Sequence, residues 1–462
     1  MAETRYVPPV IDSQPPSVYL SRLERSLQSG IARLEKARNS DDSEFLVLHE
    51  DSDGEEERKM LNTPYNLIDY IRNREYGMRK YHSVNTNFST RHVLTHILFK
   101  EHSIPLKTMN KVFCSQWLSK NEIVFGTKCN KLMVYNVKSY KLDQIPSIKG
   151  HLDEATNQRS GIRSLKINPS RTLLATGAYN SNEICIYKMS TLNPIVLAEG
   201  AHKDLIFDIE WLDEEFFVSG SQDNTIALWQ VRDISQENYD CDGDLIQPVT
   251  QFLKPTVIRN CKTAQNVRAI TFNESLKELI TLSLNGYVHV WDVEHFRQKF
   301  SRKLSYNQEI SCMETKNDSS LYAVGSKLYT LLIDSRTIEI IKKIPAMVLN
   351  RGVHKFNYGV RSLSFQDNLI TIGTGFGIIM FYDIRAGKYL ESSIHSSKKV
   401  VLKTSTGYAD PDEDLMADYE VQLVNYKPSI YTHCYDYSGT RLFSAGGPFQ
   451  ANMSGIYASL WQ

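Results

Sequence analysis

The chain contains little of what disulfide-stabilised, metal-binding or membrane-spanning proteins require. Its 462 residues include seven cysteines, an odd number, and none lies in a Cys-x-x-Cys pair. Several of these cysteines stand in apolar segments, so we expect buried free thiols in a reducing compartment. No apolar run reaches the length of a membrane helix, and residues 1–17 lack the pattern of a signal peptide. We therefore expect a soluble protein in the cytoplasm, the nucleus or both.

An excess of charge of one sign is also absent. The 53 Lys and Arg residues balance 53 Asp and Glu residues, and apolar residues make up 41% of the chain, an ordinary globular composition. A neutral chain has no bulk attraction for DNA or an anionic membrane, so we expect neither as a direct partner. The 12 histidines show no metal-ligand spacing. No catalytic constellation is found, so we expect no metal, no cofactor and no enzymatic activity.

What the sequence does contain is a pattern of short strands, clearest at residues 200–231. Within it, three segments of alternating or compact apolar residues are separated by polar turns, as in antiparallel strands. His202, Asp223 and Trp229 fall at the offsets typical of a WD40 β-propeller repeat, which this segment resembles. These three side chains are predicted to form a buried structural relay that ties the turns of the blade together.

The same pattern recurs at intervals of roughly forty residues, the period of such repeats. One blade cannot bury both of its faces, so the set predicts an all-β, seven-bladed WD40 β-propeller over residues 90–462. An early strand, near residues 104–109, is expected to complete the last blade. Residues 232–262 and 387–428 are expected to be long surface inserts. The repeats are residues 111–137, 161–188, 200–231, 267–293, 310–336, 359–385 and 431–461.

The segment before the propeller has two parts. Residues 1–60 are mostly polar and acidic and are expected to be a disordered tail. Residues 61–82 predict a basic amphipathic helix, in which Leu67, Ile68 and Ile71 form an apolar stripe. A helix of this kind has no core of its own, so it has to pack on the propeller or enter a partner's groove.

Basic residues recur near strand ends in several repeats, at Lys128, Arg163, Arg268 and Arg361. Equivalent positions of successive blades surround one central channel, so these side chains are expected to converge on one mouth. Converging guanidinium groups bind carboxylates or phosphates. A single arginine could instead extend along apolar surface or pair with a nearby acid, but several in register favour an anion pocket.

Two Asp-x-Arg boxes follow the third strands of the fifth and sixth repeats: Asp334 with Arg336, and Asp383 with Arg385. Each box places both charges at one rim of the propeller. A local salt bridge and a docking site for a partner are both compatible with this pattern.

These boxes, with NLIDYIRNRE at 66–75, GTKCN at 126–130 and YTHCYDYSGTRLFSAGGP at 431–448, resemble the WD40 substrate receptors of cullin-4 RING ubiquitin ligases. The resemblance covers residues 63–462. It implies a non-catalytic subunit that docks to the ligase's triple-propeller adaptor and, through it, joins cullin-4 and the RING subunit. The docking residues implied are Leu67, Ile68, Ile71, Arg74, Asp334, Arg336, Asp383 and Arg385.

The resemblance also implies that the propeller captures proteins with acidic, glutamate-rich C-termini. Lys128, Arg268 and Arg361 match basic positions of that pocket. Gln222 and Asn266 stand where relatives carry Arg and Lys, and each lost charge-assisted bond would weaken binding by about 1–3 kcal/mol. The preference is therefore expected to shift towards ends with one acid. The alternative function is a WD40 scaffold unrelated to ubiquitin, which would not need the helix at 61–82.

Overall fold

The computed structural model describes residues 86–106, 109–149, 161–232, 246–248, 251–304, 310–316, 318, 320–345, 359–395, 398–411, 424–450 and 453–462. The chain divides into two units, Met1–Tyr81 and His82–Gln462. The predicted acidic tail and the predicted docking helix, with Leu67, Ile68, Ile71 and Arg74, lie outside the described residues.

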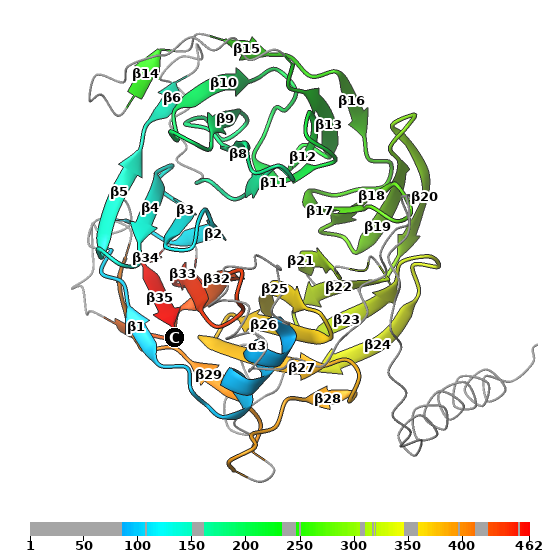
Figure 1. Ribbon diagram of the computed structural model, residues 1–462. Helices are drawn as coiled ribbons and strands as arrows, with labels where there is room; N and C mark the ends of the chain where they lie inside the picture. Colours follow the sequence, from blue (N-terminus) through cyan, green and yellow to red (C-terminus); the bar gives the residue numbers. More distant parts are fainter. Residues whose placement is uncertain are drawn as a thin grey trace, which may run out of the picture. The chain divides into compact units, whose positions relative to one another are not determined.

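Seven antiparallel sheets stand side by side around a central axis (Figure 1), which confirms the predicted propeller. Blade 1 comprises β2 (Val112–Trp117), β3 (Glu122–Thr127), β4 (Leu132–Asn136) and β5 (Lys141–Ile145). Blade 2 comprises β7 (Leu165–Ile167), β8 (Leu173–Gly177), β9 (Ile184–Lys188) and β10 (Pro194–Ala198). Blade 3 comprises β11 (Ile206–Trp211), β12 (Phe216–Ser221), β13 (Thr225–Gln230) and β16 (Val257–Asn260).

The remaining blades follow the same order, from the inner strand at the axis to the outer strand. Blade 4 comprises β17 (Val267–Asn273), β18 (Glu278–Ser283), β19 (Tyr287–Asp292) and β20 (Arg297–Lys303). Blade 5 comprises β21 (Ile310–Thr315), β22 (Leu321–Ser326), β23 (Tyr329–Asp334) and β24 (Ile340–Pro345). Blade 6 comprises β25 (Val360–Gln366), β26 (Leu369–Thr374), β27 (Ile378–Asp383), β28 (Lys388–Tyr389) and β29 (Val401–Lys403). Blade 7 comprises β32 (Ser429–Tyr435), β33 (Leu442–Gly447), β35 (Tyr457–Trp461) and β1 (Glu101–Ser103).

Strand β1 closes the ring, because it pairs antiparallel with β35 at the end of the chain, Glu101 opposite Trp461. Closure by an early strand was expected, but near residues 104–109. Pro105 has no N–H to donate to a ladder, which ends the strand. Ile104 and Leu106 instead pack into the core between blades 1 and 7.

The prediction that residues 232–262 and 387–428 are long surface inserts is wrong in part, because both segments supply outer strands. Within residues 232–262, β16 completes blade 3. Strand β14 (Ile246–Pro248) pairs in parallel with β6 (Ser147–Lys149), and β15 (Phe252–Leu253) pairs in parallel with β10. Within residues 387–428, β28 and β29 both pair with β27 at the outer edge of blade 6. Strand β30 (Gly407–Pro411) pairs with β31 (Val424–Tyr426) on one side and with β34 (Met453–Gly455) on the other. Outer strands such as β16 are largely exposed, so they lack the apolar alternation that marks inner strands.

The core consists of apolar clusters between neighbouring blades. One cluster joins Leu132 of blade 1 to Leu165 and Leu174 of blade 2, and others continue around the ring. Between blades 7 and 1, the rings of Phe125 and Phe443 stack at 5.9 Å between centroids. Burial of each such side chain contributes about 1.5–3 kcal/mol. The blades therefore depend on one another, and the ring holds its inner strands at fixed positions around the channel.

In blade 3, His202, Asp223 and Trp229 are linked through two hydroxyl groups. His202 Nε2 and Trp229 Nε1 both contact Ser219 Oγ, at 2.7 and 2.8 Å. On its other side His202 Nδ1 lies 2.9 Å from Thr225 Oγ1, which donates to Asp223. Burial alone would raise the pKa of Asp223, but hydrogen bonds from His202, Thr225 and Lys203 lower it. Trp291 and Trp461 make the same kind of bond, to Thr281 and Ser444.

Substitution of Ser219 by alanine should destabilise the propeller by about 2–4 kcal/mol, because a buried imidazole and a buried indole N–H both lose their partner. Urea unfolding of the S219A variant measures this loss. The variant Ser301→Ala, on outer strand β20 of blade 4, is the control and should change stability by less than about 0.5 kcal/mol. Equal stability of the two variants would contradict the expectation.

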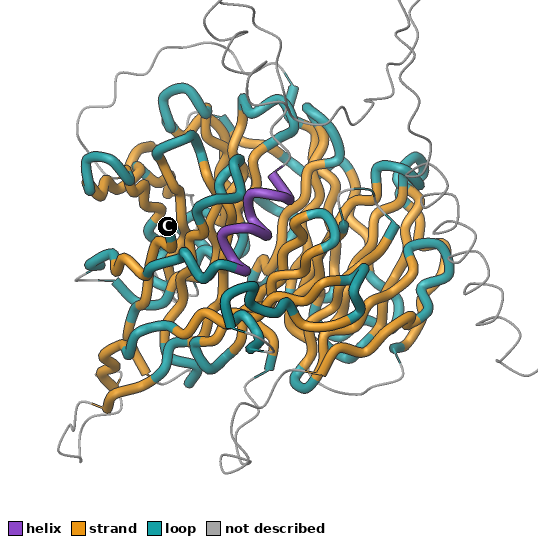
Figure 2. The backbone as a smooth tube through the Cα atoms, turned by 60° about the horizontal axis from the view of Figure 1, so that its bottom comes forward, coloured by secondary structure: helices purple, strands orange, loops and turns teal. Residues whose placement is uncertain are grey.

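A helix, α3 (Thr86–Thr95), precedes the ring and appears in purple in Figure 2. Ser89 and Thr90 donate from their hydroxyl groups to the carbonyls of Ser438 and Gly439, in the turn between β32 and β33. The carbonyl of Thr95 accepts from Ser392 and Ser393, which follow β28. Within the described part of the chain, no helix is long and apolar enough to span a membrane.

Candidate functional site

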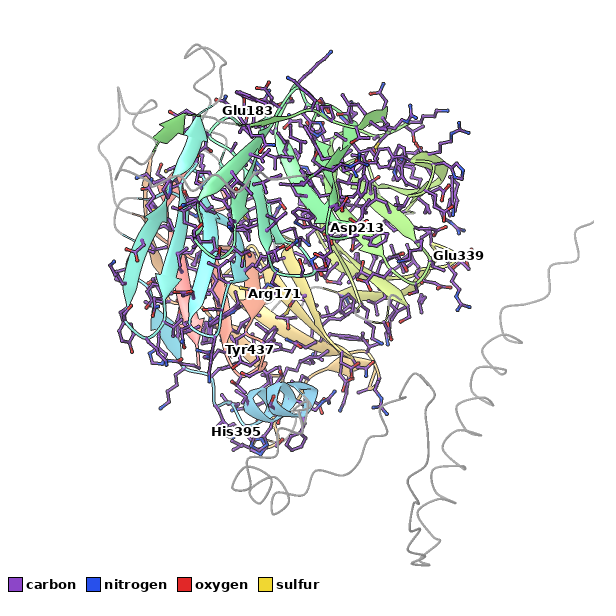
Figure 3. All side chains as sticks on the ribbon, turned by 45° about the horizontal axis from the view of Figure 1, so that its top comes forward. Arg171, Glu183, Asp213, Glu339, His395 and Tyr437 are labelled. Carbon is purple, nitrogen blue, oxygen red and sulfur yellow. The ribbon has the colours of Figure 1, made fainter. Side chains whose placement is uncertain are left out.

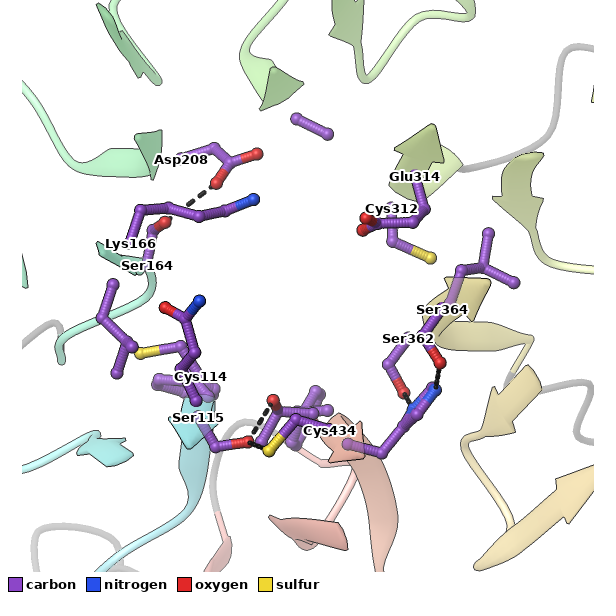
Figure 4. Close-up of a pocket in the computed structure, with 18 of the residues that line it drawn as sticks. Cys114, Ser115, Ser164, Lys166, Asp208, Cys312, Glu314, Ser362, Ser364 and Cys434 are labelled. Carbon is purple, nitrogen blue, oxygen red and sulfur yellow. Dashed lines mark hydrogen bonds between the residues drawn. The ribbon is translucent and has the colours of Figure 1, made fainter. Parts of the chain in front are cut away.

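The inner strands of the seven blades surround a channel with a volume of about 1250 Å³ (Figure 4). In six of them the pairing register shifts near the start of the strand, at the second residue or, in β32, at the third, and this bulge turns that side chain towards one mouth of the channel. In blade 2 the equivalent residue, Arg163, precedes β7. The residues at these positions therefore form a ring, which we call the mouth ring.

The mouth ring largely alternates between aromatic rings and guanidinium groups; the exceptions are Ser311 in blade 5 and the adjacent pair Tyr431 and Phe113. In order around the axis it consists of Phe113, Arg163, Phe207, Arg268, Ser311, Arg361 and Tyr431. The alternation places Arg163 between two aromatic rings. Arg163 Cζ lies 4.7 Å from the ring centroid of Phe113 and 5.0 Å from that of Phe207.

The other two arginines are supported in the same way. Arg268 Cζ lies 4.1 Å from the centroid of Phe207, and Arg361 Cζ lies 4.5 Å from that of Phe449. Stacking on an aromatic face holds a guanidinium in place without using its N–H groups. Tyr431 donates from its hydroxyl to the carbonyl of Pro448, which fixes the loop that carries Phe449.

Two guanidinium groups of the mouth ring, those of Arg163 and Arg268, repel each other. Burial, and then the neighbouring charge of Arg268, lower the pKa of Arg163 to about 10. The Nε atom of Arg163 is buried without a hydrogen-bond partner. An anionic group that entered the mouth would offset both the repulsion and the lost hydration of this guanidinium.

Three further residues predicted for the pocket, Lys128, Gln222 and Asn266, lie in loops at the same end of the blades. The backbone N–H of Lys128 donates to Asn110 and Lys111. That of Gln222 donates to Leu205, and that of Asn266 donates to Asn224 Oδ1 at 2.6 Å. None of the three belongs to the described lining of the channel. The structure thus brings Arg163, Arg268 and Arg361 together and leaves Lys128, Gln222 and Asn266 outside the lining.

Sequence analysis missed the aromatic half of the mouth ring. Phe113, Phe207 and Tyr431 occupy the same strand position as the arginines. Alignment of the seven repeats at the start of the inner strand would have shown these aromatic residues beside the arginines. Phe449 could not have been found in this way, because it lies in a loop of blade 7.

Deeper in the channel the charge changes sign. The carboxylates of Asp208, Glu210 and Glu314 and the ammonium group of Lys166 form an inner ring, in which Lys166 Nζ lies 2.7 Å from Glu210 Oε2. Asp208 accepts from Ser164 and from the backbone N–H groups of Ile209 and Ile270, at 2.8 to 3.0 Å. Figure 4 shows Lys166 and Asp208 on one side of the channel and Glu314 facing them.

The Asp-x-Arg boxes lie at the opposite end of the blades, because each follows a third strand that runs parallel to the inner strand. Asp334 accepts from the backbone N–H of Arg336 and the hydroxyl of Thr337. Asp383 accepts from the backbone N–H groups of Arg385 and Ala386. Both arginine side chains are exposed.

The ion partner of Asp383 is Arg91 of helix α3, at 2.7 Å. Helix α3 therefore lies on the face of the boxes, near Tyr437 and His395 (Figure 3). This contact was not predicted from the sequence. No group of three or more His, Cys, Asp or Glu side chains suited to a metal ion occurs in the described ranges.

The model of the DDB1- and CUL4-associated factor 12 beta propeller matches residues 94–462 of the chain. The chain belongs to this family. Pre-mRNA-processing factor 19 of Oryza sativa subsp. japonica is 23% identical over 256 residues, 52% of this chain and 43% of that protein. The WD repeat-containing protein 55 homologs of Drosophila simulans and Drosophila melanogaster are each 25% identical over 150 residues, 32% of this chain and 26% of theirs. The chain thus spans less than half the length of these relatives.

Proposed function

We propose that this member of the factor 12 family is a substrate receptor of a cullin-4 RING ubiquitin ligase, which captures acidic C-termini in the mouth ring. The observation that carries the proposal is the convergence of Arg163, Arg268 and Arg361, each on an aromatic face, at one end of the channel. WD40 receptor propellers are in general non-catalytic. On this proposal the chain selects the protein to be modified, and other subunits perform the transfer.

A peptide that ends in two glutamates matches the mouth ring in charge and size. It carries its carboxylates within one or two residues, and a narrow ring of guanidinium groups can bind them bidentately. Gln222 and Asn266 are uncharged, so these two positions add no cations to those of the mouth ring. This arrangement favours peptide C-termini whose negative charges lie close together. The smallest such end has a single acidic residue beside the terminal carboxylate.

The opposite face fits the docking of the triple-propeller adaptor. Helix α3 presents Phe88, Ile97 and Leu98 at or just beyond its ends, and their exposed fractions are 73%, 49% and 51%. Exposed Arg336 and Arg385 lie on the same face. Apolar side chains beside arginines are typical of protein interfaces. Because the two faces are at opposite ends of the blades, one chain could hold a substrate and the adaptor together.

Affinity purification from cells tests both halves of the proposal. The tagged protein is compared with two single variants, Arg361→Ala at the mouth ring and Arg385→Ala at the box. We expect R361A to recover the adaptor and cullin-4 but to lose proteins with acidic C-termini. We expect R385A to recover several-fold less adaptor while it still binds a Glu-Glu peptide in vitro.

The outcome also separates the receptor from a scaffold unrelated to ubiquitin. Absence of the adaptor from the normal sample would overturn the receptor assignment and favour the scaffold. Loss of both partner classes in both variants would show that the faces are not independent. A folded state of each variant is checked beforehand by thermal unfolding.

A further inference from the structure

The inner ring carries charge of the opposite sign to the mouth ring, and therefore of the same sign as an acidic ligand bound there. Along β21, Glu314 follows Ser311 of the mouth ring by three residues, which corresponds to about 10 Å of strand. Over that distance the channel changes from three guanidinium groups to the carboxylates of the inner ring. An anion is therefore attracted at the mouth and repelled further in.

Glu314 differs from the other carboxylates of the inner ring in its contacts. Asp208 is held by three hydrogen bonds, and Glu210 is paired with Lys166. Glu314 is partly exposed to the channel, and it lines the cavity across from Lys166 (Figure 4). Substitution of Glu314 thus changes the charge of the channel with the least disturbance of packing.

We infer that Glu314, with Asp208 and Glu210 behind Lys166, limits how deep an acidic peptide end enters and makes its capture dependent on pH. This inference rests on the proposed function and adds a limit on how far the peptide enters the channel. The last residues of the peptide stay at the mouth ring, so only a terminal acid and its immediate neighbour are selected. Deeper entry of the peptide into the channel is unfavourable, because each further carboxylate would approach Glu314.

The direction of the pH dependence follows from the groups that face Glu314. Burial, and then Glu210 and Asp208 against the opposing effect of Lys166, raise the pKa of Glu314 to about 7. A ligand carboxylate stays ionised throughout the range from pH 6 to 8. Since Glu314 gains negative charge as the pH rises through about 7, affinity for an acidic end should fall over that range.

The other titratable groups around the channel do not reverse this direction. Burial lowers the pKa of His433 to about 4, and its two ring nitrogens contact Ser362 and Ser364 at 2.8 Å. Burial raises the pKa of Cys312 to about 11 and that of Cys434 to about 12. All three are neutral at pH 6 to 8. Lys166 stays charged, because the nearby carboxylates raise its pKa despite burial.

The test is the affinity of the full-length protein for a labelled peptide ending in Glu-Glu, measured at pH 6, 7 and 8. A peptide ending in Gln-Gln amide is the reference. At pH 8 the isosteric variant Glu314→Gln should bind the acidic peptide about threefold to tenfold more tightly than the normal protein. Its affinity should also vary less between pH 6 and 8.

Glu339→Gln is the matched control, because it makes the same change on blade 5. Glu339 is exposed and pairs with Arg302 on the outer surface, where Figure 3 labels it. Equal affinity and equal pH dependence of E314Q and the normal protein would overturn the inference while the acidic peptide still binds. If the normal protein does not prefer the acidic peptide, the proposed function itself fails. The same titration series therefore distinguishes failure of the inference from failure of the proposed function.

Discussion

Replacement of both Arg163 and Arg268 by glutamine should reduce affinity for a Glu-Glu peptide by about 100-fold or more, and leave binding of a neutral-ended peptide unchanged. Each guanidinium offers charge-assisted hydrogen bonds worth about 1.5–3 kcal/mol, and 1.4 kcal/mol corresponds to about tenfold. Glutamine keeps part of the side-chain volume over Phe207 and removes the charge. The loss therefore reports on electrostatics more than on packing.

The two single variants should not add up to the double variant. Arg268 contributes to the lowered pKa of Arg163, because the two like charges lie on either side of Phe207. An anion bound by both arginines also offsets their mutual repulsion, so removal of one arginine loses its own attraction and this additional gain. Each single variant should thus lose more than half of the binding energy lost by the pair.

Fluorescence anisotropy with both peptides measures these affinities, and Arg385→Gln on the opposite face is the matched control. That variant loses one positive charge, as each single variant of the mouth ring does, and should bind the acidic peptide normally. A folded R163Q/R268Q protein that binds the Glu-Glu peptide as tightly as the normal protein would contradict an anion pocket at the mouth ring.

The elements that sequence analysis placed correctly are those whose signals are local. The inner three strands of each blade are alternating or compact apolar segments, and Trp229 and His202 stand at fixed offsets from the turns, so the blade pattern is visible in one repeat. Outer strand β16 has no comparable pattern because little of it is buried. It was therefore assigned to a surface insert.

The site was predictable only in part, for a geometric reason. Arg163, Arg268 and Arg361 share a strand position, and propeller symmetry turns equal positions into neighbours. Lys128 does not share that position, and it lies outside the channel lining. The contact of Arg91 with Asp383 joins residues 292 positions apart and has no repeat to reveal it. Contacts of this kind depend on closure of the ring and cannot be derived from local spacing.

Substitution of Asp383 by asparagine should loosen helix α3 and destabilise the protein by about 1–3 kcal/mol. Asp383 is 5% exposed, and Arg91 Nη2 lies 2.7 Å from its Oδ2 atom. Asparagine keeps an oxygen that accepts from the backbone N–H groups of Arg385 and Ala386, but it loses the charge. The half-exposed Arg91 returns to water at little cost, so the loss is smaller than for a fully buried pair.

Urea unfolding and amide hydrogen exchange of residues 86–95 measure the two effects. Exchange in α3 should increase in D383N and in Arg91→Gln, and the double variant should lose no more stability than D383N alone. Asp334→Asn is the control, because Asp334 holds the same place in blade 5 and accepts from Arg336 and Thr337 close by. Additive losses in the double variant would contradict a direct coupling of the two side chains.

The same pair links stability to docking. Helix α3 is held on the propeller by Arg91 at its centre and by Ser89, Thr90 and Thr95 around it. If the adaptor binds the surface that includes Phe88, Ile97 and Leu98, that surface must be in place before the adaptor arrives. The D383N variant should then recover several-fold less adaptor and still bind the Glu-Glu peptide normally. Normal recovery despite increased exchange in α3 would show that the helix is not part of the docking face.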